Sequence, residues 1–300
     1  MRIFLTGATG FIGSRILPEL RARGHEVVGM TRSEAGAAAL VAAGADVHRA
    51  SLEDLPAIVA GVADADAVIH TAFDHDFSNF VENCEKDRRV IRALGSALKG
   101  SDRRLMITSG TGMGDAGDGR PATEAVFSQS HPNPRIASEQ AAARLLDEGV
   151  NVAVMRLPQV HDTVRQGLIS PYIDIARAKG VVGYVGAGDN RWPAAHVTDV
   201  AALYALAFDK GDAGVRYHAV AEQGISVRSI AEVVGRGLGM PVVSVPEADV
   251  AAHFGWFAGF VGLDMPASSA ATRAQIGWLP TGPDLLTDLE NMDYAVPSAQ

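Results

Sequence analysis

The sequence predicts an α/β fold, in which a doubly wound parallel sheet with helices on both faces is joined to a smaller, mainly C-terminal lobe. Three observations predict it. Three evenly spaced glycines follow an apolar strand near the start of the chain, apolar strands then alternate with helix-like stretches, and this alternation ends after Pro158. Strands that alternate with helices at this spacing indicate a parallel sheet covered on both sides.

The first strand, Arg2–Thr6, runs into the sequence GATGFIG. Gly7 allows a tight turn off the strand, Gly10 allows the backbone to approach a pyrophosphate, and Gly13 allows the first helix to pack closely on the sheet. The amides at the start of that helix then face the anion. This stretch predicts a Rossmann-type dinucleotide-binding turn. The residues expected to contact the cofactor here are Gly7, Thr9, Gly10, Phe11, Ile12 and Gly13.

The elements expected before Pro158 follow one another in regular alternation. The expected strands are Arg2–Thr6, Glu26–Thr31, Ala45–His48, Ala67–Ala72, Leu105–Ser109 and Val152–Leu157. The expected helices are the stretch that continues to Arg23, then Ala35–Ala43, part of Ser51–Gly61, Val81–Leu98 and Arg135–Glu148.

The pattern after Pro158 is less regular. We expect helices at Gln166–Lys179, Asp199–Phe208 and Ser226–Leu238, a glycine-rich loop at Gly180–Asn190 and a strand at Tyr217–Ala221. The predicted division is a dinucleotide-binding core at 1–158 to which 193–222 returns, a substrate lobe at 159–192 and 223–292, and a tail at 293–300.

The composition and net charge of the chain argue against some classes of function. The net charge of −9 argues against general binding to nucleic acid or to anionic membranes, which needs a basic face. The single cysteine, Cys84, cannot form an internal disulfide, which fits a reducing compartment. The sequence shows neither a leader pattern nor an apolar run long enough to span a bilayer, so we expect a soluble, cytoplasmic protein.

Several motifs occur in an ordered series along almost the whole chain. They are TGATGFIG (Thr6–Gly13), AVIHTAF (Ala67–Phe73), Asn83 with the helix that follows it, ITSGTG (Ile107–Gly112), VMRLP (Val154–Pro158), WPAAHVTDVA (Trp192–Ala201) and SSAATRAQIGWLPTGP (Ser268–Pro283). In this order and spacing they resemble the extended and atypical short-chain dehydrogenase/reductases, a group also labelled epimerase/dehydratase-like. The resemblance implies further cofactor contacts at Ser51, Leu52, Thr71, Ala72, Phe73, Thr108 and Pro158.

The resemblance fails at the usual Tyr-x-x-x-Lys pair. In HPNPRIASEQAAARLL the Tyr position is Arg135 and the Lys position is Glu139. In the usual enzyme the Lys lowers the pKa of the Tyr, so that the phenol exchanges a proton with the substrate near neutral pH. Arg135 and Glu139 are four residues apart on an expected helix, where they form either a surface ion pair or a pair that points toward the nicotinamide.

Other groups are candidates for the missing chemistry. An arginine can stabilise a developing alkoxide but cannot readily donate its proton. Candidate proton donors are Thr111, His131, His161 or water, and Asn83 lies on the helix that matches the active-site helix. The run from Asp74 to Asp76 lacks the spacing of a metal site, so no metal is expected.

Arg32 and Ser33 follow the second strand, where the adenosine ribose is expected. An acidic residue there favours NAD, whereas a basic residue pairs with the 2′-phosphate of NADP. We therefore expect NADP(H) as the cofactor.

The favoured function is an NADPH-dependent oxidoreductase that reduces a carbonyl or imine of a small molecule without the usual Tyr/Lys pair. A non-catalytic NADP(H)-binding redox sensor and a sugar-nucleotide epimerase or dehydratase are the alternatives. The resemblance also implies a possible homodimer, formed by the helices at Val81–Leu98 and Arg135–Glu148.

Overall fold

The computed structural model describes residues 1–295, and the end of the predicted tail, 296–300, lies outside the described residues. Seven parallel strands form the central sheet in the order β10-β6-β5-β4-β1-β2-β3. This confirms the doubly wound α/β fold. The strands are β1 (Arg2–Thr6), β2 (Glu26–Thr31), β3 (Asp46–Arg49), β4 (Ala67–His70), β5 (Arg104–Gly110), β6 (Val152–Leu157) and β10 (Arg216–His218).

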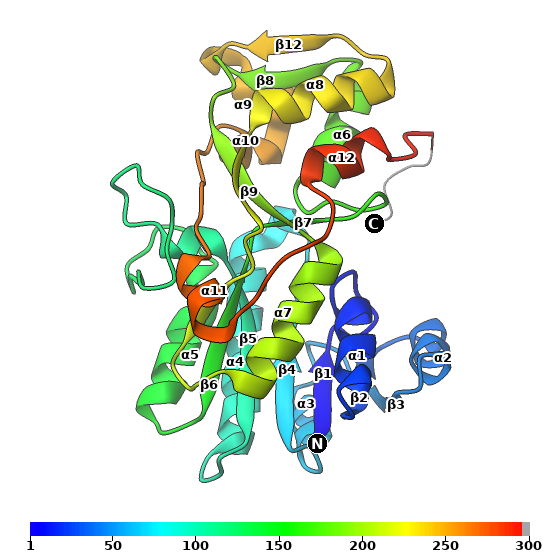
Figure 1. Cartoon of the computed structure of the whole chain (residues 1–300), viewed down its shortest axis with the longest axis vertical. Helices are drawn as coiled ribbons and strands as arrows, with labels where there is room; N and C mark the ends of the chain where they lie inside the picture. Colours follow the sequence, from blue (N-terminus) through cyan, green and yellow to red (C-terminus); the bar gives the residue numbers. More distant parts are fainter. Residues whose placement is uncertain (296–300) are drawn as a thin grey trace.

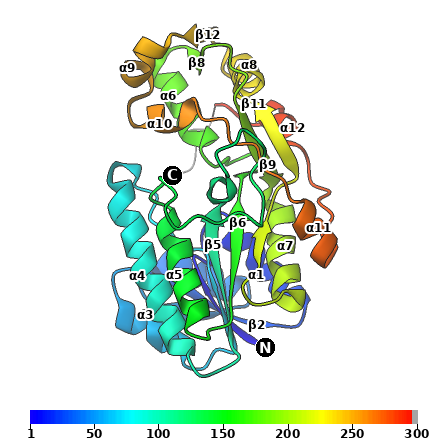
Figure 2. The same cartoon turned by 90° about the vertical axis from the view of Figure 1, so that its left-hand side faces the viewer.

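Helices cover both faces of this sheet (Figures 1 and 2). One apolar layer joins the sheet to α1 (Gly13–Ala22), α2 (Glu34–Ala42), α7 (Val197–Lys210) and the segment around α11 (Ala270–Ile276). The other joins it to α3 (Leu55–Val62), α4 (Phe80–Leu98) and α5 (Ile136–Asp147). Pro18 lies inside α1 without ending it.

The smaller lobe lies beyond the carboxyl ends of the core strands (Figure 1). It has its own apolar core. It contains α6 (Ile169–Lys179), α8 (Val227–Leu238), α9 (Val250–Phe254), α10 (Ala258–Val261), α12 (Leu285–Glu290) and the parallel pair β8 (Val182–Val185) and β12 (Val242–Val245). A three-stranded sheet of β11 (Glu222–Ser226), β9 (Arg191–His196) and β7 (Gln159–His161) joins lobe and core.

The structure corrects the sequence-based interpretation at several places after Pro158. Strand β8 lies within Gly180–Asn190, which we expected to be a loop, and β7, β9 and β11 were not expected as strands. These strands are three to six residues long, so they carry too little alternation to be recognised. Ile276 and Trp278 pack into the core, although the prediction placed them in the lobe.

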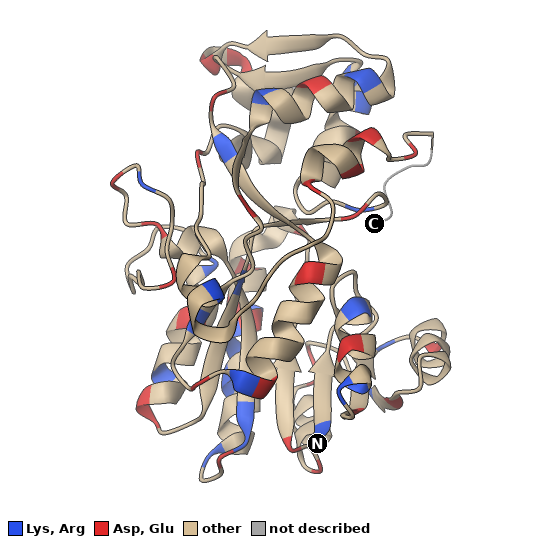
Figure 3. Ribbon diagram, in the orientation of Figure 1, with Lys and Arg blue, Asp and Glu red and all other residues tan. Residues whose placement is uncertain are grey.

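Lysine and arginine positions alternate with aspartate and glutamate positions along the core helices and the lobe (Figure 3). No helix of the described residues is long and apolar enough to cross a membrane. Because ligands of doubly wound sheets bind at the carboxyl ends of the strands, the candidate site lies where β1, β4, β5 and β6 end.

Candidate active site

The turn between β1 and α1 has the geometry of an anion-binding loop. Gly7 has φ +67°, and a Cβ there would lie 2.7 Å from the Ala72 amide nitrogen. A Cβ on Gly13 would lie 2.1 Å from the Gly7 carbonyl oxygen, so only glycine lets the helix start this close to the strand. A Cβ on Gly10 would meet only the Gly7 carbonyl oxygen, at 3.1 Å, and Gly10 is exposed.

The start of α1 has no capping side chain. The residue before the helix, Ile12, makes no side-chain cap, whereas Ser33 and Asp54 cap α2 and α3. Uncapped amides at a helix start form a site for an anion. The loop residues therefore fit the pyrophosphate of a dinucleotide, with Thr9 exposed and Phe11 half-buried beside it.

The end of β4 is tied to this loop by Thr6. The Thr71 hydroxyl donates to the Thr6 carbonyl oxygen (2.8 Å), and the Ala72 amide donates to the Thr6 Oγ1 (3.3 Å). The next residue, Phe73, carries the guanidinium carbon of Arg135 4.1 Å from its ring centroid. This stacking places Arg135 beside the end of β4.

Arg135 is fixed by hydrogen bonds to two other elements. Its Nη1 donates to Asp87 Oδ2 on α4 (2.6 Å) and to Ser138 Oγ (2.6 Å), and its Nη2 donates to the Thr108 carbonyl oxygen at the end of β5 (2.9 Å). Its side chain is only 14% exposed. The guanidinium is therefore rigidly placed at the carboxyl edge of the sheet.

Asp87 is the centre of a buried polar network. Its second oxygen, Oδ1, lies 2.9 Å from His70 Nε2, and His70 Nδ1 lies 2.7 Å from Thr6 Oγ1. Burial acts to raise the pKa of Asp87, but the Arg135 charge and the hydrogen bonds outweigh it and lower the pKa to about 2. The network thus connects the glycine-rich turn to Arg135 through an ionised carboxylate.

Glu139 belongs to a different cluster, which corrects the expected pairing with Arg135. Its carboxylate is fully buried and accepts two hydrogen bonds from Arg156 on β6 (2.7 and 2.8 Å) and one from Arg216 on β10 (3.0 Å). Burial opposes ionisation, but the hydrogen bonds and charge of Arg156 outweigh it and lower the pKa of Glu139. Glu139 is neither half of a surface ion pair nor a partner of Arg135.

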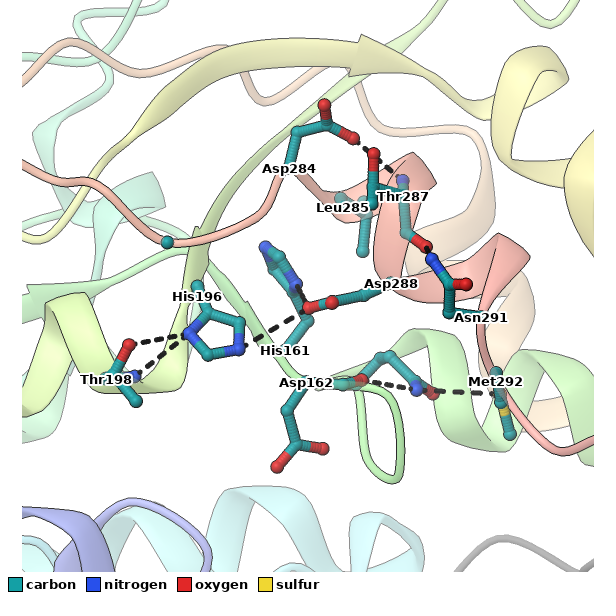
Figure 4. A network of polar contacts seen from close by, with 12 residues as sticks. His161, Asp162, His196, Thr198, Asp284, Leu285, Thr287, Asp288, Asn291 and Met292 are labelled. Atoms are coloured by element: carbon teal, nitrogen blue, oxygen red, sulfur yellow. Dashed lines mark hydrogen bonds and ion pairs between the residues drawn. The ribbon is translucent and has the colours of Figure 1, made fainter.

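His161 is buried between the core and the lobe (Figure 4). Its Nδ1 lies 2.7 Å from Asp288 Oδ2 of α12, and its ring meets the His196 ring at 5.7 Å between centroids. His196 in turn caps α7, since its Nδ1 accepts from the Thr198 amide (3.4 Å). The side chain of His161 is fully buried where the core and the lobe meet, so it is not exposed as a proton donor.

The remaining catalytic candidates have local structural contacts. The Asn83 amide donates to the Asp76 carbonyl oxygen (2.8 Å) and fixes the loop before α4. His131 Nδ1 accepts from the Asn133 amide (3.2 Å) within a turn. Thr111 starts a short 3-10 helix directly after β5 and is 4% exposed.

Two of the predicted cofactor residues, Thr108 and Leu52, contact other residues of the core. Thr108 Oγ1 donates to the His70 carbonyl oxygen (2.8 Å) and lies 2.6 Å from the Tyr204 hydroxyl. Leu52 packs partly into the core, while Ser51 and Pro158 are half-buried.

Arg32 is exposed at the end of β2. The neighbouring Ser33 Oγ accepts from the Gly36 amide (3.0 Å), so this hydroxyl caps α2. Arg49, at the end of β3, reaches the same place and bonds the Ser33 carbonyl oxygen and the Glu34 carboxylate. Arg49 therefore lies beside the expected ribose position, already bonded to Ser33 and Glu34.

A family model described as the NAD dependent epimerase/dehydratase family matches residues 3–221. The chain belongs to this family. It is 45% identical over 295 residues to an uncharacterized protein of Schizosaccharomyces pombe, covering 98% of this chain and 100% of the relative. A 4-hydroxy-2-methyl-3-oxo-4-farnesyl-3,4-dihydroquinoline-1-oxide ketoreductase of Stigmatella aurantiaca is 26% identical over 273 residues, with 85% and 80% covered.

Solved structures share the fold of this epimerase/dehydratase family member. A UDP-glucose 4-epimerase from Thermotoga maritima with UDP-glucose has a TM-score of 0.76 at 19% identity, covering 98% of this chain and 97% of that one. A dTDP-glucose 4,6-dehydratase from Streptomyces venezuelae with NAD and TYD bound also has a TM-score of 0.76, at 18% identity, covering 98% and 96%.

The site of this epimerase/dehydratase family member also contains residues that the sequence did not single out. Asp87 lies one helical turn after Asn83, a spacing that puts both on one face of α4 and could have indicated it. Arg165, in the loop between β7 and α6, places its guanidinium carbon 5.9 Å from the Phe11 ring centroid, over the glycine-rich turn. No sequence signal connects these distant positions.

Proposed function

We propose that this chain is an NADPH-dependent reductase of a carbonyl or imine group, in which Arg135 replaces the usual Tyr/Lys pair. The observation that carries the proposal is the fixed guanidinium at the carboxyl edge of the sheet, bonded to Asp87 and to the Thr108 carbonyl oxygen. Membership of a family that uses nicotinamide nucleotides supplies the class of cofactor.

The residues that would hold the cofactor are those of the glycine-rich turn, the end of β2 and the end of β4. When bound, NADPH supplies a hydride to the carbon of the C=O or C=N group. The uncapped start of α1 would bind the pyrophosphate, with Arg165 above it. Arg32 would pair with the 2′-phosphate.

Arg135 would stabilise the negative charge that develops on the substrate oxygen. Three hydrogen bonds and the stack on Phe73 hold its guanidinium in place, so little reorganisation is needed during the reaction. Because arginine stays protonated, the proton that completes the alcohol comes from water. Tyr204 is the one phenol bonded at the end of β5, but burial raises its pKa.

The contacts of Arg191 favour reduction over sugar-nucleotide chemistry. Arg191 lies at the start of β9, which joins the lobe to the core, and its guanidinium is bonded to both oxygens of Asp264 (3.0 and 2.8 Å). A diphosphate would have to displace Asp264 to bind this edge of the guanidinium. The ketoreductase relative, at 26% identity, agrees with a ketone substrate.

The test is oxidation of NADPH, and of NADH in parallel, by the purified full chain with a panel of ketones, aldehydes and imines. We expect turnover with NADPH and little with NADH. The variant Arg32→Asp should reverse this preference, because it removes the 2′-phosphate partner and adds a ribose acceptor. An unchanged preference would show that Arg32 does not select the cofactor.

The variant Arg135→Ala tests the catalytic proposal. Loss of one such charge typically lowers kcat by about 10²- to 10³-fold, and free guanidinium added to the assay should restore part of the rate. Arg89→Ala is the matched control, since Arg89 pairs with Glu82 on the exposed side of α4. Tight NADPH binding without turnover of any substrate would favour the redox-sensor alternative.

A further inference from the structure

Five aromatic side chains form a continuous cluster between the core and the lobe, which we call the aromatic bridge. Phe73 and Phe77 come from the segment that joins β4 to α4, and Phe80 is the first residue of α4. Trp256 and Phe260 come from the segment around α10. The Phe77 and Trp256 rings are stacked, with centroids 5.0 Å apart and planes 5° from parallel. Phe260 meets Phe80 edge-on at 6.2 Å, and Phe80 meets Phe73 at 6.4 Å.

The aromatic bridge starts at the proposed reacting group. Phe73 carries the Arg135 guanidinium on its face at 4.1 Å, so one end of the bridge is the residue that would stabilise the substrate oxygen. The other end, Trp256, is 45% exposed. A group attached to a carbonyl at Arg135 would therefore run along these rings toward solvent.

The bridge adjoins the apolar core of the lobe, since Phe257 of that core lies 5.4 Å from Trp256 and 6.2 Å from Phe260 between ring centroids. Phe254 and Phe257, which are adjacent in sequence to Trp256, are 2% and 0% exposed and belong to that core. None of the five bridge rings is fully buried. Clustered aromatic surface that is left accessible marks a binding site more often than a packing layer.

Two cations near the bridge, Lys86 and Arg191, are already paired. Lys86 on α4 donates to Asp74 (2.7 Å) and to Glu53 (3.0 Å), and Arg191 is held by Asp264. A phosphate or carboxylate on the distal part of a substrate would find no uncommitted cation among these groups, whereas a flat apolar group would find ring faces.

We propose that the aromatic bridge binds the non-reacting part of the substrate, and that this part is a flat aromatic group of one or two fused rings. The inference rests on the proposed reductase function, because it places the carbonyl of the ligand at Arg135. The preferred substrate class is then an aryl ketone or aldehyde rather than a phosphorylated or sugar-linked carbonyl.

Binding is tested separately from turnover by calorimetric titration of 2-acetonaphthone into the full chain saturated with NADP⁺. This oxidised cofactor cannot reduce the ketone. We expect Trp256→Ala and Phe77→Ala each to weaken binding about ten-fold, which is the typical effect of one aromatic pair. Trp256→Phe keeps a ring and should bind nearly as well as the original chain. Leu279→Ala, which alters an exposed apolar residue outside the bridge, is the matched control.

Turnover gives the second readout, as the ratio of kcat/KM for 2-acetonaphthone to that for butanone. We expect Trp256→Ala to lower this ratio about ten-fold, since butanone has no ring to stack. An equal loss for both ketones, or no loss for either, would overturn the inference and leave the reductase function standing. Ring-dependent binding without turnover of any carbonyl would support the bridge and refute the reductase.

Discussion

Lowering the pH is expected to destabilise this protein through His218, at the end of β10. Its Nδ1 lies 2.8 Å from the Ser268 carbonyl oxygen, and its Nε2 lies 3.2 Å from Arg156 Nη1. The neutral ring satisfies both contacts by donating to the carbonyl and accepting from the guanidinium. A second proton on Nε2 would face the positive charge of Arg156. Burial and that charge together lower the pKa of His218 to about 4.

The sign and size of the effect follow from this lowered pKa. The unfolded chain takes up the proton near pH 6.5, while the folded chain does so only near pH 4. The neutral His218 ring stabilises the folded chain fully above pH 6.5, and this stabilisation is lost as the pH falls below that value. At about 1.4 kcal/mol per pKa unit, the whole effect is about 3 kcal/mol, of which about 2 kcal/mol is lost by pH 5.

The assay is urea unfolding of the full chain at pH 7 and at pH 5. The variant His218→Gln keeps an acceptor for Arg156 and a donor for the Ser268 carbonyl, but it does not titrate. We expect its free energy of unfolding to fall by about 2 kcal/mol less than that of the original chain over this pH range. Burial also lowers the pKa of His161, which therefore accounts for part of the pH dependence of the unfolding free energy that remains in the variant. Equal slopes for the variant and the original chain would refute the reasoning.

Three further outcomes are expected. Gly13→Ala should destabilise the fold by about 1–3 kcal/mol or more and abolish NADPH binding, because its Cβ meets backbone atoms. Gly262→Ala is the control: there is open space around it, so neither the stability nor the binding measured by calorimetry should change. Asp87→Ala should cost about 3–5 kcal/mol in urea unfolding, because it leaves Arg135 unpaired. Glu82→Gln, at an exposed ion pair, should cost about 1 kcal/mol or less. Tyr204→Phe should cost about 1 kcal/mol, since it removes only the bond to Thr108.

The sequence was most informative where local chemistry determines structure. Gly7 and Gly13 occupy positions where a side chain would collide with backbone atoms, so the spacing of the glycines carries the geometry of the turn. The parallel core followed from the regular alternation of apolar strands with helices before Pro158. Strands β7, β9 and β11, which join the lobe to the core, are short and pair with strands far away in the chain, so no local pattern indicates them.

The interpretation of Arg135 and Glu139 shows the limit of spacing arguments. Side chains four residues apart meet only when both lie within a helix. α5 begins at Ile136, so Arg135 stands at its cap and turns toward α4. Each residue has a partner distant in sequence: Asp87 is 48 residues from Arg135, and Arg156 is 17 residues from Glu139. Tertiary contacts of this kind have no signature in a single sequence.

In the proposed reductase, the pairing of Arg135 with Asp87 also narrows the chemistry. Asp87 has a pKa of about 2, and an arginine remains protonated throughout the physiological range. Neither group changes its protonation state near pH 7, so the pair acts as a fixed charge arrangement and not as a proton reservoir. A fixed positive charge is sufficient to stabilise the oxyanion formed by hydride addition to a carbonyl. Epimerisation and dehydration require a base that removes a proton from the substrate, and this pair does not supply one. The same contacts that hold Arg135 in place therefore favour reduction over the other reactions of the family.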